Sequence, residues 1–147
     1  MSIAARTAET VWQGSLASGQ GVVKPGSGAF EPLSVTWASR TEQPNGLTSP
    51  EELAAAAHSS CFAMALTLRL GEHHAKAERL RVTATVVLDE VDGRPTIVSS
   101  TIQVQGRAPE LDAAGFQAAV DEAADLCPIS RLFAGAQIGV TAELEQV

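Results

Sequence analysis

The longest largely apolar stretch of the chain begins after Ser49 and has the pattern and caps of a helix. Ser49 is a favoured N-cap residue, Pro50 suits the first helical position, and Glu52 can complete a capping box with the serine. Alanine and leucine dominate from there to Leu70, and Gly71 supplies the expected end. Because this helix is apolar around most of its circumference and its side chains are small, we expect it to be buried and to pack closely on another helix.

Alternation of apolar and polar residues predicts strands on both sides of this helix. The segments 79–89 and 96–105 alternate in this way, and the Asp92-Gly93 pair between them is a strong hairpin signal. Asp112 can cap a second helix over 113–126, and a further turn starts at Pro128. The remaining strands are expected at residues 10–15, 21–24, 32–40 and 137–144.

The predicted element order is therefore β-β-β-α-β-β-α-β. Neighbouring strands joined by short turns dominate this order, which favours an α+β fold with a mostly antiparallel sheet packed against the long central helix. At 147 residues, the chain is expected to form a single domain over 1–147.

Composition narrows the class of function. Apolar residues make up 45% of the chain and charged residues 18%, as in globular rather than disordered proteins. The net charge of −7 argues against nucleic acid or an anionic membrane as a partner, since both select for basic surfaces. We expect no bilayer-spanning segment, because no apolar run approaches the ~20 residues needed to span a bilayer. Residues 1–10 carry no secretory signal, so we expect a cytoplasmic protein whose thiols stay reduced.

Two cysteines, Cys61 and Cys127, stand in contexts unlike those of ordinary core cysteines. Cys61 lies in the predicted long helix, and Cys127 lies where the second helix stops and Pro128 can start another. They do not form a CxxC motif, so they can meet only through the tertiary fold. If they meet, the natural chemistry is oxidation of one thiol and its resolution by the other. Local electrostatics favour Cys127 as the nucleophile, since an N-cap position stabilises a thiolate.

Other roles are compatible with the same residues. A cysteine in an alanine-rich helix is usually a packing residue, and His58 can be a base, a metal ligand or a hydrogen-bonded core histidine. A zinc site built from His58, Cys61 and Cys127 lacks a fourth ligand of suitable type and spacing. Inert or disulfide-bonded cysteines would indicate a binding module, whereas a general thiol-disulfide oxidoreductase usually carries a CxxC motif. His73 and His74 are expected in an exposed loop.

Arg40 and Glu51 flank the loop before the long helix. In the simpler interpretation, Arg40 is a surface residue and Glu51 is a first-turn glutamate favoured by the helix dipole. In the alternative, Arg40 lies at a pocket, where it lowers the pKa of a thiol and polarises a bound oxygen. Glu51 would then fix the guanidinium through a bidentate pair. Arg6 and Arg69 are the fallback arginines for this role.

At these residues the sequence resembles the OsmC/Ohr family of thiol-dependent hydroperoxide peroxidases, and more closely its OsmC branch. The resemblance extends over essentially the whole chain, and the two cysteine motifs together are specific. The matching segments are Trp12-Gln13-Gly14, Ser49-Pro50-Glu51-Glu52-Leu53, residues 56–66 (AAHSSCFAMAL), Leu70-Gly71-Glu72, Leu88-Asp89 and Cys127-Pro128-Ile129-Ser130.

The resemblance implies an OsmC-like fold in an intertwined homodimer, with two active sites at the subunit interface. It implies a peroxidase that reduces organic hydroperoxides to alcohols, and hydrogen peroxide less well. Cys61 matches the family's peroxidatic cysteine and Cys127 its resolving cysteine, which overrides the electrostatic preference for Cys127. Arg40 and Glu51 match the active-site arginine and glutamate. The family uses no metal or bound organic cofactor and takes its electrons from dithiols, including lipoylated proteins.

Helix geometry bears on the implied dimer. Glu51 and Cys61 are separated by about 15 Å along one helix. Two antiparallel copies of the helix that cross near residues 55–57 would bring Glu51 of one chain beside Cys61 of the other. We therefore expect composite sites, in which at least one of Arg40 and Glu51 comes from the partner chain.

Overall fold

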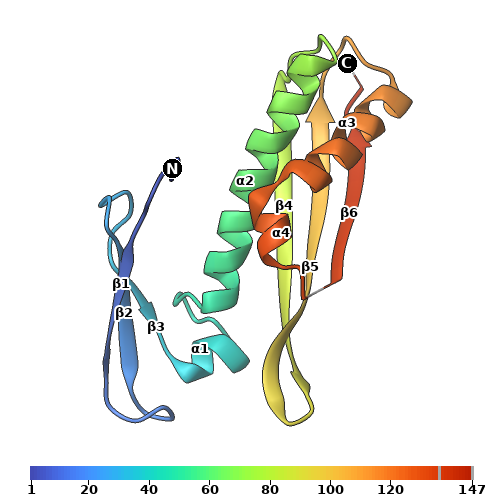
Figure 1. Ribbon diagram of the computed structural model, residues 1–147. Helices are drawn as coiled ribbons and strands as arrows, with labels where there is room; N and C mark the ends of the chain where they lie inside the picture. The colour runs from blue at the N-terminus through green and yellow to red at the C-terminus, as the bar shows by residue number, and fades with distance from the viewer. Residues whose placement is uncertain (136, 147) are drawn as a thin grey trace. The chain divides into compact units, whose positions relative to one another are not determined.

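The computed structural model describes residues 1–135 and 137–146. The chain divides into two compact units, Met1–Leu53 (the N-terminal unit) and Ala54–Val147 (the C-terminal unit). The elements are β1 (Ala8–Gln13), β2 (Gln20–Pro25), β3 (Leu33–Val35), α1 (Trp37–Thr41), α2 (Pro50–Glu72), β4 (Arg79–Val91), β5 (Arg94–Arg107), α3 (Ala113–Leu126), α4 (Pro128–Leu132) and β6 (Gln137–Leu144) (Figure 1). This order confirms the predicted α+β arrangement, with α4 at the expected further turn, and adds the short helix α1.

The N-terminal unit contains a three-stranded antiparallel sheet in the order β1-β2-β3. The last strand ends at Val35, so the predicted strand over 32–40 is wrong beyond that residue. The Thr36 hydroxyl accepts a hydrogen bond from the Ser39 N–H, and the Ser39 hydroxyl accepts one from the Thr36 N–H, both at 3.0 Å. This local capping box starts α1, and Arg40 is therefore a helical residue.

Helix α2 begins at the predicted cap and ends later than predicted. The Ser49 hydroxyl accepts a hydrogen bond from the Glu52 N–H at 3.1 Å, and the Glu52 carboxylate accepts one from the Thr48 hydroxyl at 2.7 Å. Gly71 stays inside the helix. Instead, His74 adopts the left-handed conformation (φ 57°), and its N–H donates to the Gly71 carbonyl at 3.0 Å. Histidine thus takes the terminal position that glycine usually occupies.

The C-terminal unit contains a second three-stranded sheet in the order β4-β5-β6. Strands β4 and β5 form the predicted antiparallel hairpin, with Asp92 (φ 51°) and Gly93 (φ 74°) in its turn. Strand β6 is parallel to β5. Parallel neighbours need a long crossover, and α3 provides it. As predicted, Asp112 is the N-cap of α3; its carboxylate accepts a hydrogen bond from the Gly115 N–H at 2.8 Å.

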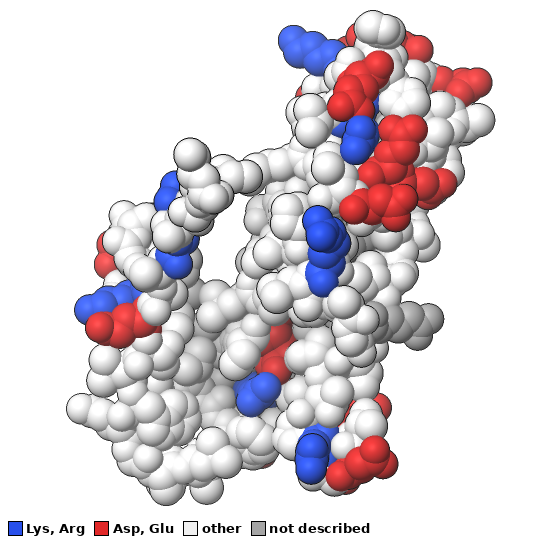
Figure 2. Space-filling model, viewed as in Figure 1, with Lys and Arg blue, Asp and Glu red and all other residues white. Residues whose placement is uncertain are grey.

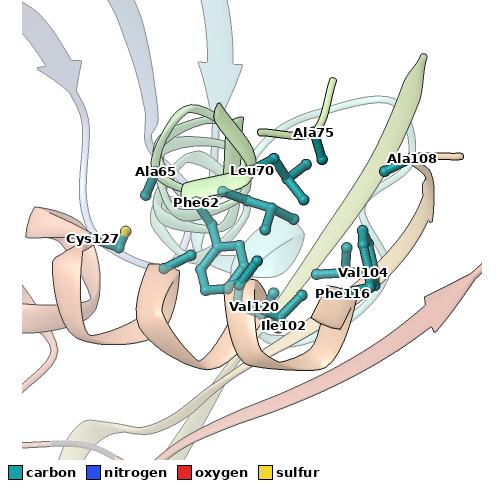
Figure 3. Close-up of a cluster of buried hydrophobic side chains, with 13 residues drawn as sticks. Phe62, Ala65, Leu70, Ala75, Ile102, Val104, Ala108, Phe116, Val120 and Cys127 are labelled. Carbon is teal, nitrogen blue, oxygen red and sulfur yellow. The ribbon is translucent and has the colours of Figure 1, made fainter. Parts of the chain in front are cut away.

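Helices α2 and α3 cover one face of the β4-β5-β6 sheet (Figure 1). Successive side chains of a strand point to opposite faces, so Ser100, Ile102, Val104 and Gly106 of β5 all point toward the helices. Burial of each large apolar side chain there contributes about 1.5–3 kcal/mol. The core drawn in Figure 3 combines Phe62, Leu66 and Leu70 of α2, Ile102 and Val104 of β5, Phe116, Ala119, Val120 and Ala123 of α3, and Cys127.

By length and composition alone, α2 is long and apolar enough to cross a membrane, with a mean hydropathy of 1.3. The core helix of a globular protein passes the same test, so the expectation of no bilayer-spanning segment stays a prediction. One face of α2 carries fully buried core residues such as Phe62 and Leu66, as the core helix of a globular unit does. The opposite face is open in the isolated chain, where Met64 is 71% exposed and Leu68 is 55% exposed. The expectation that α2 is buried all round is therefore wrong for a single chain.

Charged side chains are unevenly distributed on the C-terminal unit. In the view of Figure 2, aspartate and glutamate side chains gather where α2 ends and α3 lies. Two side-chain contacts lie in this region: His73 Nε2, in the loop after α2, is hydrogen-bonded to the Glu122 carboxylate at 3.0 Å, and Arg69 forms an ion pair with Glu72. Both histidines lie in the loop after α2, as expected. His74 is exposed, whereas His73 is half-buried, so the expected exposure is wrong for His73.

Candidate active site

The C-terminal unit brings the two cysteines together. Cys61 is partly buried on α2, and Cys127 is completely buried at the junction between α3 and α4. Cys127 is at once the C-cap of α3 and the N-cap of α4, with Pro128 at the first helical position, as the sequence predicted. Both thiols are free, and Cys61 packs against the core cluster that contains Cys127, close enough for the Cys127 thiol to act on the pKa of Cys61. A pair that no sequence motif connects is therefore assembled by the tertiary fold.

The surroundings of Cys61 act on its pKa in opposite directions. Burial raises the pKa of the Cys61 thiol above its ordinary value, and the adjacent Cys127 thiol raises it further. A hydrogen bond from the Ile129 backbone N–H, in the first turn of α4, lowers it. Since burial is the largest of these effects, Cys61 is held as a neutral thiol, and a reactive thiolate requires a cation close by.

His58 lies one turn before Cys61 on α2 and is completely buried. Its Nδ1 is 2.5 Å from the Ser100 hydroxyl of β5, and its Nε2 is 2.9 Å from the Ser130 hydroxyl of α4. The ring of Phe133 is 5.3 Å away between centroids. Burial lowers the pKa of His58, so the imidazole is neutral near pH 7. Of the roles open to His58 in the sequence, the structure supports the hydrogen-bonded core histidine.

The zinc alternative fails in this structure. Within residues 1–135 and 137–146, no three histidine, cysteine, aspartate or glutamate side chains lie close enough together to hold a metal ion. Both ring nitrogens of His58 are already bonded to serine hydroxyls. The set of His58, Cys61 and Cys127 is therefore not a metal site here.

The N-terminal unit places Arg40 and Glu51 together. The Arg40 Nη2 is 2.7 Å from Glu51 Oε1, and its Nε is 3.0 Å from Oε1 and 3.2 Å from Oε2. The guanidinium carbon also lies 5.9 Å from the centre of the Trp37 ring. A hydrogen bond from the Ser39 hydroxyl to the Thr48 carbonyl, at 2.9 Å, ties α1 to the segment just before α2. The bidentate pair considered from the sequence is present, and both of its members belong to one chain.

The fallback arginines are engaged elsewhere. Arg69 pairs with Glu72 on the same helix, and the exposed Arg6 donates to the Ala5 carbonyl at 2.7 Å. Arg40, which the sequence singled out, stays the candidate for this role.

Sequence reasoning missed the partners of His58. Ser130 belongs to the Cys127-Pro128-Ile129-Ser130 motif, but nothing in that motif indicates that its hydroxyl points at a histidine. Ser100 carried a usable signal, because strand alternation puts it on the same face as Ile102 and Val104. A polar residue at a core-facing position must find a hydrogen-bond partner, and His58 is that partner.

Comparison with known proteins agrees with these features. The family model for OsmC-like protein matches residues 43–143. Peroxiredoxin OsmC of Escherichia coli (strain K12) is 36% identical over 121 residues, which cover 82% of this chain and 84% of that protein. Organic hydroperoxide resistance protein OhrA of Bacillus subtilis (strain 168) is 37% identical over 101 residues, 67% of this chain and 68% of that protein.

Comparison with solved structures points to the same group of proteins. The crystal structure of an organic hydroperoxide resistance protein OsmC from Legionella pneumophila superposes with a TM-score of 0.74 at 20% identity, and covers 99% of this chain and 100% of that one. Family model, sequence relatives and fold agree, and the chain belongs to the family of OsmC-like proteins.

Proposed function

We propose that this protein is a thiol-dependent peroxidase that reduces organic hydroperoxides to alcohols, and hydrogen peroxide less well. The observation that carries the proposal is that Cys61 and Cys127, two free thiols, are neighbours, one partly exposed and the other completely buried. The relatives named peroxiredoxin OsmC and organic hydroperoxide resistance protein OhrA support the same activity.

In the first step, the Cys61 thiolate attacks the distal oxygen of the hydroperoxide. An S–O bond forms while the O–O bond breaks, so the sulfur becomes a sulfenic acid and the alkoxide leaves and takes up a proton as the alcohol. Because burial raises the pKa of Cys61, this step needs a nearby positive charge. Lowering a thiol pKa by about two units corresponds to ~2.7 kcal/mol of differential stabilisation.

We assign that charge to Arg40. Glu51 binds the Nε and Nη2 side of its guanidinium, which leaves Nη1 and the second Nη2 hydrogen free to face a thiolate or a peroxide oxygen. A donor aimed at the developing alkoxide stabilises the transition state. In this scheme Glu51 orients Arg40 and transfers no proton.

In the second step, the Cys127 thiol attacks the sulfur of the Cys61 sulfenic acid. An S–S bond forms, the S–O bond breaks, and hydroxide leaves as water with the proton released from Cys127. An external dithiol then reduces the disulfide by exchange and is itself oxidised. The resemblance favours a lipoylated protein as that dithiol. A dithiol-dependent reaction of this kind suits the reducing cytoplasm, where we place the protein.

We further propose that the working protein is a homodimer. The open face of α2 is apolar or small, and small side chains allow two helices to approach closely. A second copy of the same face is the occupant we assign, since such a stripe is unfavourable in water. The exposed residues of this face are Ala56, Ala57, Ser60, Met64, Thr67 and Leu68.

The function is tested by the consumption of cumene hydroperoxide by the purified protein, with dihydrolipoamide or dithiothreitol as the reductant and Cys61→Ser as the control. We expect turnover that the variant loses. Turnover should be slower with hydrogen peroxide, because burial of an apolar substituent contributes ~0.8 kcal/mol per methylene. If neither dithiol supports turnover and both thiols react slowly and alike, the peroxidase is wrong and a binding module becomes the better hypothesis.

A further inference from the structure

His58 joins three elements of the C-terminal unit at one point. It belongs to α2, and its two ring nitrogens contact Ser100 of β5 and Ser130 of α4 at 2.5 and 2.9 Å. His58 and Ser100 are completely buried, and Ser130 is 7% exposed. The peroxidase chemistry described above uses none of these three side chains.

The chemistry of the three groups suits a mechanical role. A neutral imidazole has one donor and one acceptor nitrogen, and each serine hydroxyl can rotate to match either. Both contacts are therefore satisfied without a charge, and hydrogen bonds shielded from water are costly to break. The site holds groups in place and needs no change of protonation to do so.

The element held in this way is α4, which carries two groups that act on the thiol of Cys61. Cys127 is its N-cap residue, and the Ile129 backbone N–H acts on the Cys61 thiol, whose pKa it lowers. Ser130, the next residue, bonds to His58. Since α4 is only five residues long, it has little stability of its own and depends on such contacts.

We propose that His58 and Ser130 form a positioning pair. Their hydrogen bond holds α4 against α2, so that Cys127 and the Ile129 amide remain next to the Cys61 thiol. A disulfide requires Cα atoms roughly 4.4–6.8 Å apart and a narrow dihedral range, so a small movement of α4 would hinder its formation. The proposal rests on the proposed function for its catalytic consequence, which is the rate at which the sulfenic acid of Cys61 is resolved by Cys127.

Two variants remove the bond from opposite ends. Ser130→Ala deletes one oxygen, and His58→Phe keeps an aromatic ring against Phe133 but bonds to neither serine. After one equivalent of cumene hydroperoxide, both should form the Cys61–Cys127 disulfide about tenfold more slowly, in line with the loss of one buried hydrogen bond. More sulfenic acid should then be trapped by dimedone. The pKa of Cys61, measured from alkylation rates against pH, should rise because the Ile129 contact loosens.

A second readout needs no peroxide. In dithiothreitol redox buffers, the equilibrium constant for the Cys61–Cys127 disulfide should shift about tenfold toward the dithiol in both variants. Ser130→Thr keeps the hydroxyl and should restore both readouts. Two controls should leave them unchanged: Ser59→Ala, whose hydroxyl donates to the Ala56 carbonyl of its own helix, and Val120→Ala, which loosens the core on α3.

The outcomes separate the two proposals. Wild-type rates and a wild-type equilibrium in Ser130→Ala would overturn the positioning role, and so would an equal effect of Val120→Ala, since general loosening would then suffice. If the wild-type protein forms no sulfenic acid with cumene hydroperoxide, the proposed function is wrong. The positioning role is still tested in that case, because the disulfide equilibrium in redox buffers shows whether the His58–Ser130 bond sets the geometry of the thiol pair.

Discussion

The guanidinium of Arg40 and the carboxylate of Glu51 form a two-point ion pair, in which Nη2 lies 2.7 Å from Oε1 and Nε lies 3.2 Å from Oε2. The Glu51 side chain is only 11% exposed and that of Arg40 is 28% exposed. Two parallel bonds fix the plane of the guanidinium, which a single contact to a flexible side chain would not do. The pair therefore presents a cation in a set orientation.

Arg40→Lys tests whether this orientation matters. Lysine keeps the charge, but it cannot bind Glu51 at two points and offer a further donor to a peroxide at the same time. We expect the first oxidation step to slow by about 10²-fold, the usual effect of losing one aimed donor in a transition state. Single-turnover kinetics with cumene hydroperoxide measure it. Arg6→Lys, at an exposed arginine, should behave as wild type. Full activity in Arg40→Lys would remove the arginine from the mechanism.

Local signals in the sequence predicted most of the fold, but the long-range contacts of the site were not accessible to them. Caps at Ser49 and Asp112 and the Asp92-Gly93 turn are decided by neighbouring residues, and all three are present. The helix at Trp37–Thr41 was missed because its capping box is formed by Thr36 and a serine, where the pattern expects glutamate or glutamine at the third position. The contacts of His58 join residues 42 and 72 positions away, and no local pattern encodes such distances.

Cys127→Ser should separate the two halves of the reaction. Serine matches the shape of the buried thiol but cannot form a disulfide, so Cys61 should react once and remain a sulfenic acid. Excess peroxide should then drive Cys61 to sulfinic and sulfonic acid, which intact-mass spectrometry detects. Cys61→Ser should show neither product. Repeated turnover of Cys127→Ser with dithiothreitol at the wild-type rate would mean that the external thiol resolves Cys61 directly.

His58 should make the protein less stable in mild acid. Burial lowers the pKa of His58 in the folded state, so the unfolded chain binds a proton more readily. The free energy of unfolding is therefore highest above the pKa of about 6.5 that His58 has in the unfolded chain, and it decreases as the pH falls from there toward the pKa of the folded state. Titration of this one group changes the free energy of unfolding by no more than ~1.4 kcal/mol per pH unit. Urea unfolding between pH 7.5 and 5.0 measures this slope. His58→Gln lacks the titrating ring, so its slope should be flatter; parallel slopes would contradict the prediction.

Gly106 is a position where even one methyl group should be destabilising. A Cβ built on this glycine would overlap the ring of Phe116 and lie 3.0 Å from Leu80 Cδ2. We expect Gly106→Ala to lower the free energy of unfolding by about 1–3 kcal/mol, the usual cost of overpacking a core. Gly139→Ala on the neighbouring strand is a matched control, since its Cβ would meet only Thr101, at 3.8 Å. Equal effects of the two substitutions in urea unfolding would show that strand glycines matter here for backbone reasons alone.

The contribution of each chain to a site can be decided by mixing two defective homodimers. In a mixed dimer of Cys61→Ser and Arg40→Lys chains, the Arg40→Lys chain supplies the intact cysteine and the Cys61→Ser chain supplies the intact arginine. If each site combines Cys61 of one chain with Arg40 of the other, the mixed dimer has one complete site.

Activity should then rise after the two variants are unfolded and refolded together, since a random mixture contains about half mixed dimers. If Arg40 serves the cysteine of its own chain, no mixed dimer has a complete site and the activity stays at the average of the two variants. Mixing Arg40→Lys with Glu51→Gln is the matched experiment for the ion pair. Both members of the pair lie on one chain, so neither chain of this mixed dimer keeps an intact Arg40–Glu51 pair, and no recovery of activity is expected. Recovery would mean that Arg40 of one chain pairs with Glu51 of the other in the working dimer.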